Sequence, residues 1–284
     1  MKINTETRIC AVIGNPIAHS LSPLIHNAAF RERSINYVYV AFQVEDLKGA
    51  IAGVKALGIK GLSVTIPHKI EIIKYLDEID PLALAIGSVN TVVNTQGRLK
   101  GYNSDGPGAL KALKDSGVDL NGSKVLILGS GGAARAVAFS LARDGNIANL
   151  SILGILTDQM EDLIKDIESK VGFKADGELI KKGRLKEKMR EVDILIHCTP
   201  VGMYPQVEES LVDKRYLKRD LVVFDIVYNP LKTRLFKDAE EMGCKIVLGS
   251  EMFLNQAAIQ FQLFTGVEPP VESMRNVLLG YLKE

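Results

Sequence analysis

The sequence predicts an α/β protein, and three observations support this fold class. Strand-like and helix-like segments alternate through the first hundred residues. A second alternating series begins near residue 105, and its strands are almost continuously apolar, which is typical of strands covered on both faces. A chain of 284 residues is long enough for two domains or one large domain.

In the first series, short apolar runs bounded by turn residues predict strands over 8–13, 37–42 and 61–66. A hairpin is expected over 89–93 and 98–102, and the sheet should be mostly parallel. Ser22 is expected to act as the N-cap of a helix whose first residue is Pro23. Further helices are predicted over 46–57 and 69–76.

In the second series, we expect strands over 124–128, 150–153, 192–198, 221–226 and 245–248. Helices are expected over 106–116, 132–144 and 158–171, followed by 250–264 and 271–281 on either side of a double proline. The lysine-rich stretch 173–190 has no clear period and is expected to form surface structure.

The composition excludes several classes of function. The chain is 46% apolar and 24% charged, with a net charge of +1 and no basic stripe, so nucleic acid is not an expected partner. Its three cysteines are scattered and none has CxxC spacing, which argues against a disulfide framework and a metal site. No apolar run approaches the ~20 residues of a membrane span. The segment Met1–Glu6 lacks a signal-peptide core, so we expect a cytoplasmic protein without membrane contact.

The segment 126–135 reads as a strand, a glycine-rich turn and the start of a helix, the unit that binds dinucleotides. Gly129 suits the tight turn, Gly131 allows close approach of a pyrophosphate, and Ala134 takes the place of the third glycine. The helix start directs N–H groups and a positive dipole toward phosphates. The predicted cofactor-binding residues here are Gly129, Ser130, Gly131, Gly132 and Ala133. The alternative is a tight turn that binds nothing.

The second strand of such a unit usually ends at a residue that reads the adenosine ribose, an acid for NAD or an arginine for NADP. Between Leu150 and Ile164 there is no basic residue, and no acid stands directly at the strand end. The local sequence therefore leaves both NADP and NAD open.

Two polar segments, 63–69 and 101–106, carry residues that a buried core does not need. Lys69 and Asp105, if brought together, could move a proton on and off an alcohol oxygen, and with a dinucleotide this indicates hydride transfer between an alcohol and a ketone. Ser20 and Ser22 could bind a carboxylate near a helix start or act only as local caps. Asn90 either binds ligand or closes a turn.

These segments together resemble the shikimate dehydrogenase family. The resemblance runs along the chain through 14–27, 61–69, 87–91, 101–106, 129–134, 199–203, 225–230 and 250–256. It implies an N-terminal α/β substrate domain and a Rossmann-like dinucleotide-binding domain with a cleft between them. The substrate-binding catalytic domain would comprise 1–104 and 250–284, and the NADP domain 105–249. The implied reaction is the reversible, NADP-dependent reduction of 3-dehydroshikimate to shikimate, a step of aromatic amino acid biosynthesis.

By matching position, the resemblance also implies roles for single residues. Lys69 and Asp105 would be the catalytic pair. Ser20 and Ser22 would hold the ring carboxylate, and the ring hydroxyls would be held by Thr65, Lys69, Asn90, Asp105 and Gln256. Tyr228 would stand near substrate and nicotinamide, and Gly249 would lie beside the nicotinamide.

The chain departs from the family pattern after Leu153, where members carry an arginine for the 2′-phosphate. Two alternatives therefore stay open: a quinate/shikimate dehydrogenase that uses NAD, and a non-catalytic metabolite sensor. Retention of Lys69 and Asp105 argues against the sensor, which needs no proton transfer. The expected partner is a small molecule, and the protein is expected to be a monomer or a homodimer.

Overall fold

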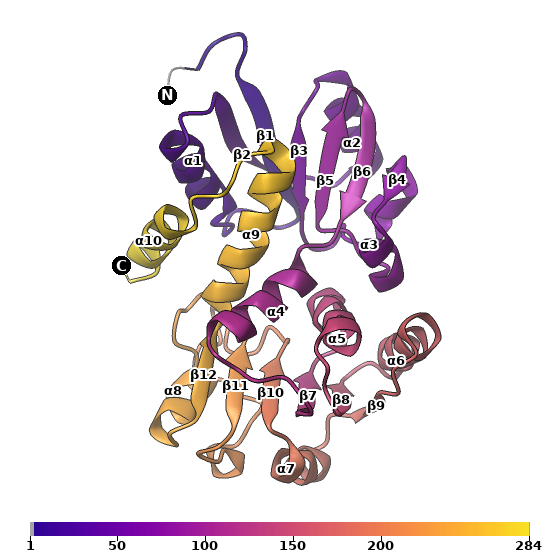
Figure 1. Cartoon of the computed structure of the whole chain (residues 1–284), viewed down its shortest axis with the longest axis vertical. Helices are drawn as coiled ribbons and strands as arrows, with labels where there is room; N and C mark the ends of the chain where they lie inside the picture. The colour runs from indigo at the N-terminus through magenta and orange to yellow at the C-terminus, as the bar shows by residue number, and fades with distance from the viewer. Residues whose placement is uncertain (1–2, 284) are drawn as a thin grey trace. The chain divides into compact units, whose positions relative to one another are not determined.

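The computed structural model describes residues 3–283 (Figure 1). Within them, one compact unit takes the chain up to Ser104 and again from Leu254, and a second runs from Asp105 to Phe253. Each unit is built around its own six-stranded sheet. Met1, Lys2 and Glu284, which the predicted substrate domain includes, lie outside the described residues.

The first unit has a mixed sheet with strand order β2-β1-β3-β5-β6-β4. Its strands are β1 (Arg8–Gly14), β2 (Tyr37–Gln43), β3 (Gly61–Val64), β4 (Glu78–Ile79), β5 (Thr91–Thr95) and β6 (Arg98–Tyr102). Its helices are α1 (Ser22–Glu32), α2 (Leu47–Ala56), the 3₁₀ helix η1 (Glu71–Tyr75), α3 (Pro81–Ile86) and α10 (Val271–Leu282), with most of α9 (Gly249–Thr265). β1 is parallel to β2 and β3, whereas the predicted hairpin β5–β6 is confirmed and is antiparallel.

Apolar side chains cover both faces of this sheet. On one face, α1 and α9 pack aromatic rings together, with the ring centroids of Phe30 and Phe261 5.5 Å apart. On the other face, α2 buries Leu47, Ile51 and Val54 in a common core with β1, β3 and β5. Because helices pack on both faces of the sheet, the ends of its strands are held in place. The polar loops described below begin at these strand ends.

The second unit has a fully parallel sheet with strand order β12-β11-β10-β7-β8-β9. Its strands are β7 (Lys124–Leu128), β8 (Asn149–Gly154), β9 (Asp176–Leu179), β10 (Ile194–His197), β11 (Val222–Asp225) and β12 (Lys245–Leu248). Its helices are α4 (Asp105–Asp115), α5 (Gly132–Asp144), α6 (Thr157–Val171), α7 (Lys182–Glu191), the 3₁₀ helix η2 (Lys214–Tyr216) and α8 (Arg234–Glu241). The buried, parallel strands predicted from the continuous apolar runs are confirmed.

Two local predictions were wrong. The segment predicted as a helix over 69–76 is a turn followed by η1, because Pro67 and the turn after it delay the first helical residue to Glu71. Ser22 is the first residue of α1 and not its N-cap; Leu21 holds that position, and no side chain caps the helix.

The stretch 173–190 contains β9 and all but the last residue of α7, two elements that its sequence did not predict. α7 buries only Leu185 and Met189, so its apolar stripe is a single pair four residues apart and gives almost no helical period. α3 and α8 were also missed, although Asp80 and Thr233 cap them through their side chains.

Candidate active site

Asn90 is the centre of a buried polar cluster in the first unit. It is 2% exposed and lies just before β5. Its side-chain oxygen accepts hydrogen bonds from the Ser104 amide (2.8 Å) and the Thr91 hydroxyl (2.7 Å), and its side-chain amide donates to Ser104 Oγ (3.0 Å). Asn90 therefore fixes Ser104, the residue directly before Asp105.

The cluster continues as a chain of hydrogen bonds in which each group donates to the next. The Tyr39 hydroxyl donates to Ser63 Oγ (2.5 Å), which donates to Gln260 Oε1 (2.6 Å). Gln260 Nε2 donates to Thr91 Oγ1 (3.0 Å), and Thr91 donates to Asn90. Because these buried groups satisfy one another, the strand ends around Asn90 are held in one arrangement. The sequence indicated Asn90 alone; the chain through Tyr39 and Gln260 was missed.

Lys69 and Thr65 lie on the turn after β3, beside this cluster. The Lys69 carbonyl accepts a hydrogen bond from the Val89 amide (2.8 Å), which ties the lysine backbone to the residue before Asn90. The Thr65 amide donates to the Ile13 carbonyl (3.0 Å) at the end of β1. Both side chains are half-buried, and β1 and β3 are parallel neighbours, so the loops after them leave the same edge of the sheet.

Ser20 stands on the loop that leaves this end of the sheet after β1, and Ser22 is the first residue of α1, which follows that loop. Ser22 is 5% exposed, whereas Ser20 is half-buried. The Ser22 amide donates to Ser20 Oγ at 3.4 Å, which is a weak contact at best. Neither hydroxyl caps α1, so the alternative that these two serines act only as helix caps does not hold for this helix.

Asp105 and Gln256 are both nearly buried, at 7% and 8% exposure. Asp105 is the first residue of α4 in the second unit. Gln256 lies on the part of α9 that belongs to the first unit, with its Oε1 3.5 Å from Ser104 Oγ. The same serine thus contacts Asn90 and Gln256, two residues predicted to bind substrate.

The glycine-rich turn of the second unit is as tight as its sequence predicts. Gly129 has φ +113°, and an added Cβ there would lie 2.8 Å from the Cys198 carbonyl oxygen, so only glycine fits. An added Cβ at Gly131 would meet no protein atom within 4 Å, so the space in front of it is open. α5 begins at Gly132 without a side-chain cap, which leaves backbone N–H groups for a phosphate.

At the end of β8, Ile155 and Leu156 are 78% and 50% exposed. The segment from Leu150 to Ile164, which contains this strand end, has no basic residue. Arg135, on the first turns of α5, forms an ion pair with Asp166 on α6 and lies over the Phe139 ring. Its guanidinium is therefore held by the protein in this structure.

Tyr228 and Gly249 lie beyond the carboxyl ends of β11 and β12. The Tyr228 ring stacks on Phe253 with centroids 4.5 Å apart, and burial raises the pKa of its phenol, which keeps it neutral. An added Cβ at Gly249 would lie 2.5 Å from the carbonyl oxygens of Ile226 and Val227. Glycine is therefore required at 249 for the start of α9 to pack against this loop.

The sequence matches two domain profiles of one enzyme family. The shikimate dehydrogenase substrate binding domain matches residues 12–92, and the shikimate 5'-dehydrogenase C-terminal domain matches 249–279. The shikimate dehydrogenase (NADP(+)) of Methanocaldococcus jannaschii is 47% identical over 280 residues, which are 98% of each chain. This chain belongs to the shikimate dehydrogenase family.

Solved structures of the family share the whole fold. A shikimate dehydrogenase in complex with NADP+ is 44% identical, covers 100% of this chain and 98% of that chain, and superposes with a TM-score of 0.93. The shikimate 5-dehydrogenase of Listeria monocytogenes, in complex with shikimate and NAD, is 38% identical with 98% of each chain covered and a TM-score of 0.91. The resemblance and the fold class predicted from sequence are confirmed.

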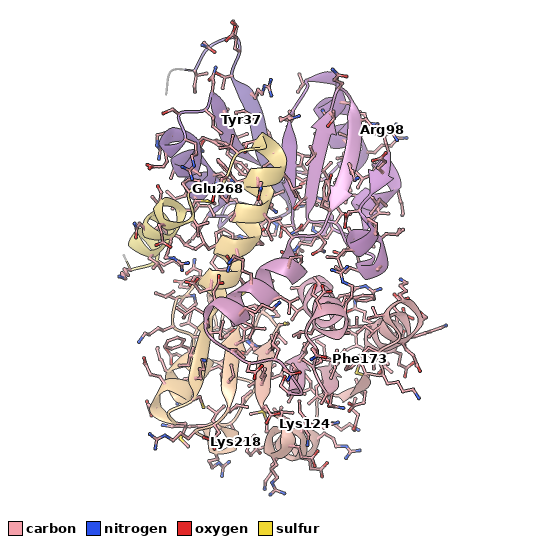
Figure 2. The ribbon with its side chains drawn as sticks, in the orientation of Figure 1. Tyr37, Arg98, Lys124, Phe173, Lys218 and Glu268 are labelled. Carbon is pink, nitrogen blue, oxygen red and sulfur yellow. The ribbon has the colours of Figure 1, made fainter. Side chains whose placement is uncertain are left out.

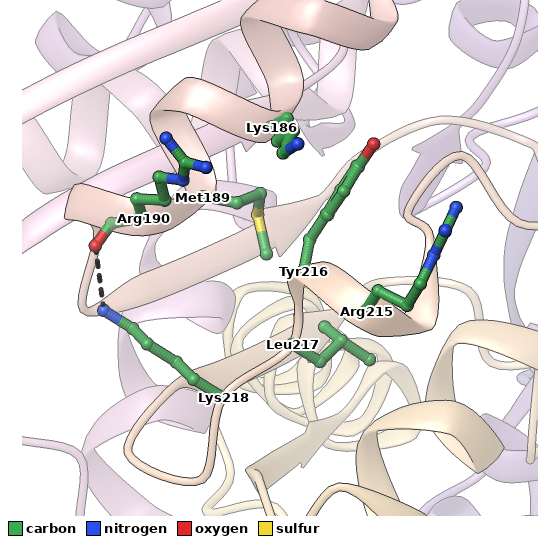
Figure 3. Close-up of a pocket in the computed structure, with 7 residues that line it drawn as sticks. All are labelled: Lys186, Met189, Arg190, Arg215, Tyr216, Leu217 and Lys218. Carbon is green, nitrogen blue, oxygen red and sulfur yellow. Dashed lines mark hydrogen bonds between the residues drawn. The ribbon is translucent and has the colours of Figure 1, made fainter.

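The second unit has a hollow of about 510 Å³ (Figure 3). It is lined by Lys186, Met189, Arg190, Arg215, Tyr216, Leu217 and Lys218. These residues come from α7 and η2 and the turn after it, which lead into the starts of β10 and β11. Lys218 lies at the same end of the sheet as Lys124, the first residue of β7 (Figure 2). The hollow therefore lies at the amino ends of the strands, whereas ligands of open parallel sheets bind at the carboxyl ends.

The described part of the chain, residues 3–283, contains no cluster of His, Cys, Asp and Glu side chains that could hold a metal ion. Nor does any helix within those residues have the length and apolar character needed to cross a membrane.

Proposed function

We propose that this protein catalyses the reversible, NADP-dependent reduction of 3-dehydroshikimate to shikimate, the step that serves aromatic amino acid biosynthesis. The observation that carries the proposal is the 47% identity, over nearly the whole length of both chains, to a shikimate dehydrogenase (NADP(+)). The quinate and sensor alternatives are not favoured by this relationship. The first unit would bind the substrate, and the second would bind the cofactor.

Substrate binding is assigned to the polar edge of the first unit. Ser20 and Ser22 bind the ring carboxylate, and two hydroxyls that donate hydrogen bonds suit an anion without placing a full positive charge there. The ring hydroxyls are bound by Thr65, Asn90 and Gln256. The fixed hydrogen-bond chain behind Asn90 supports this role, since a polyhydroxylated ring is recognised by donors and acceptors held at set positions.

Lys69 and Asp105 are assigned as the catalytic pair. In the direction of reduction, the carbonyl oxygen gains negative charge and takes up a proton; in oxidation the alcohol loses one. A lysine ammonium can donate that proton, and a carboxylate beside it can stabilise the charged lysine. We treat the two residues as one coupled unit and assign the proton to the pair. Tyr228 is assigned a place near substrate and nicotinamide.

Cofactor binding is assigned to Gly129, Ser130, Gly131, Gly132 and Ala133, with Gly249 beside the nicotinamide. The positive φ of Gly129, the open space at Gly131 and the uncapped start of α5 fit a pyrophosphate. When bound, the cofactor would supply the hydride as NADPH in reduction and accept it as NADP+ in oxidation. The absence of a basic residue at the end of β8 predicts that its preference over NAD is weaker than in a site equipped with arginine.

The test is a set of initial-rate measurements with shikimate and quinate, each with NADP+ and with NAD+. We expect the highest kcat/KM with shikimate and NADP+. The preference for NADP+ should stay below about a thousandfold, because the end of β8 lacks a charged contact that would be worth roughly 1.5–3 kcal/mol, or about 10–150-fold. No turnover of shikimate with either cofactor would refute the proposed function. A cytoplasmic location, a monomeric or dimeric state and the lack of a nucleic acid partner stay predictions of the sequence.

A further inference from the structure

His197, the last residue of β10, is held through both nitrogens of its ring. Nδ1 lies 2.9 Å from Asp225 Oδ1, and Nε2 lies 2.5 Å from Thr199 Oγ1. His197 and Asp225 are 2% and 4% exposed, and they are direct partners in the register of β10 and β11. Because an ionised carboxylate only accepts hydrogen bonds, Nδ1 donates to Asp225. With both nitrogens occupied, the ring is not placed to act as a general base.

Asp225 extends the contact to two further segments. Its Oδ1 also accepts a hydrogen bond from the Val227 amide (3.1 Å), and its Oδ2 accepts one from the Thr233 hydroxyl (2.6 Å). Thr233 in turn caps α8. On the other side, Thr199 Oγ1 accepts from the Val201 amide (3.3 Å). The pair therefore ties the loop after β10 to the loop after β11.

Each of these loops packs closely against a glycine that we propose to bind the cofactor. An added Cβ at Gly129 would lie 2.8 Å from the Cys198 carbonyl oxygen and 3.3 Å from Thr199 Cγ2. An added Cβ at Gly249 would lie 2.5 Å from the Val227 carbonyl oxygen. A shift of either loop would change the space at the carboxyl edge of the sheet, where a dinucleotide binds.

We infer that His197 and Asp225 are a positioning pair that sets the two loops bordering the cofactor, with His197 acting through Thr199 and Asp225 through Val227. The inference rests on the proposed function for its cofactor. His197 touches neither the reacting atoms nor the nicotinamide in this role, so its effect should appear in cofactor binding before it appears in chemistry.

The test compares wild type with His197→Ala and His197→Asn. The alanine variant loses both contacts, and we expect the KM for NADP+ to rise about tenfold to a hundredfold, since a displacement of about 1 Å can have effects of that size. Asparagine keeps a short donor toward Asp225 and should recover part of the loss. The KM for shikimate should change less than about threefold, because no contact to the substrate is removed.

Two further measurements separate positioning from simple loss of stability. His26→Ala removes another buried histidine, in the first unit, and should lower the Tm without changing the KM for NADP+. Thr199→Val keeps the side-chain shape and removes the hydroxyl that contacts His197 Nε2 and accepts from the Val201 amide. If His197→Ala does not fold, Thr199→Val carries the test, with an expected rise in the KM for NADP+ of about fivefold to tenfold.

Calorimetric titration with NADPH makes the result independent of turnover. Weaker NADPH binding in the His197 and Thr199 variants, with normal binding in His26→Ala, supports the inference even if shikimate were not the substrate. Unchanged NADPH affinity in both His197→Ala and Thr199→Val would overturn it, whatever happens to the Tm.

Discussion

The two units place polar groups at the edges of their sheets in different ways. In the first unit, side chains meet side chains: Asn90, Thr91 and Gln260 are buried and complete one another's hydrogen bonds. In the second unit, the turn after β7 presents backbone N–H groups. Gly129 has no Cβ, and a Cβ there would collide with the Cys198 carbonyl oxygen. A ring with several hydroxyls needs directional donors and acceptors at fixed points, whereas a pyrophosphate needs N–H groups and close approach. The difference matches the two ligands that we propose.

Two of the buried histidines, His26 and His197, show a similar contrast. His26 in the first unit stacks on Tyr39, with ring centroids 4.4 Å apart and planes at 3°. His197 in the second unit is bound at both ring nitrogens. The first histidine behaves as a packing group, and the second behaves as a connector between loops.

The largest effect is expected when the chemistry assigned to the first unit is removed. Lys69→Ala should lower kcat by about 10²–10⁴-fold with little change in KM, because general acid–base groups contribute that much. Steady-state kinetics with shikimate and NADP+ measure it. Lys74→Ala, an exposed lysine a few residues later on η1, is the matched control and should keep wild-type kcat. A kcat for Lys69→Ala within about threefold of wild type would contradict the catalytic role of Lys69.

The histidine contrast predicts a pH effect on stability. Burial lowers the pKa of His26 to about 3, with Gln260 opposing the shift. Below pH 6.5 the unfolded chain takes up a proton here and the folded chain does not, so stability falls as the pH drops from 6.5 toward 3. One pH unit corresponds to about 1.4 kcal/mol, so about 2–3 kcal/mol should be lost two units below the ordinary pKa.

Urea unfolding of wild type and His26→Phe at pH 6.5 and pH 4.5 checks this expectation. Phenylalanine keeps the stack on Tyr39 and removes the titration, so the variant should lose less stability on acidification. Carboxyl groups with lowered pKa values, such as Asp213 beside Arg215, add the same loss to both proteins and cancel in the difference. Parallel pH profiles for the two proteins would show that His26 does not titrate in this way.

The carboxylate assignment is tested at Ser20 and Ser22. Replacing either by alanine should raise the KM for shikimate about 10–150-fold, since a hydrogen bond to a charged group is worth roughly 1.5–3 kcal/mol. kcat should change much less. If the KM stays at the wild-type value in both variants, the paired hydroxyls have no ligand and the first unit loses its proposed carboxylate site.

The side-chain cluster itself can be broken at Asn90. Asn90→Ala leaves the Ser104 amide without its acceptor and should cost roughly 1–3 kcal/mol in the free energy of unfolding, together with a loss of kcat/KM. Asn94, on the same hairpin, is also buried and bonds the Ile59 carbonyl and the Gly97 amide. Asn94→Ala should therefore lose similar stability and keep its kcat/KM. Equal activity losses in both variants would mean that the cluster around Asn90 is ordinary core.

The smallest effect concerns the cofactor edge of the second unit. Ile155→Arg places a charge on an exposed position at the end of β8 and should raise the preference for NADP+ over NAD+ by about tenfold, near the lower limit for a charged contact. Leu57→Arg, an equally exposed substitution on the first unit, is the control and should leave the ratio unchanged. A wild-type preference already above about a thousandfold would reveal a phosphate anchor elsewhere.

The sequence by itself determined the parts whose cause is local. Apolar runs specified the parallel strands β7, β8, β10, β11 and β12, because a strand covered on both faces must be apolar throughout. The glycine-rich turn could be predicted from the sequence because only glycine suits position 129. The backbone there has a positive φ, and the Cys198 carbonyl leaves no room for a Cβ. Asn90 was noticed because a polar residue interrupts an apolar segment.

Tertiary structure decided what depends on pairing between distant segments. His197 and Asp225 are 28 residues apart and meet only because β10 and β11 pair in that register. Ser63 and Gln260 are separated by 197 residues and meet because α9 packs on the first sheet. None of these four residues is of an unusual type for its position. No local sequence pattern therefore identifies either contact. The helix α7 was also not predictable from its own sequence. It buries only Leu185 and Met189, and two apolar residues are too few to show a helical period.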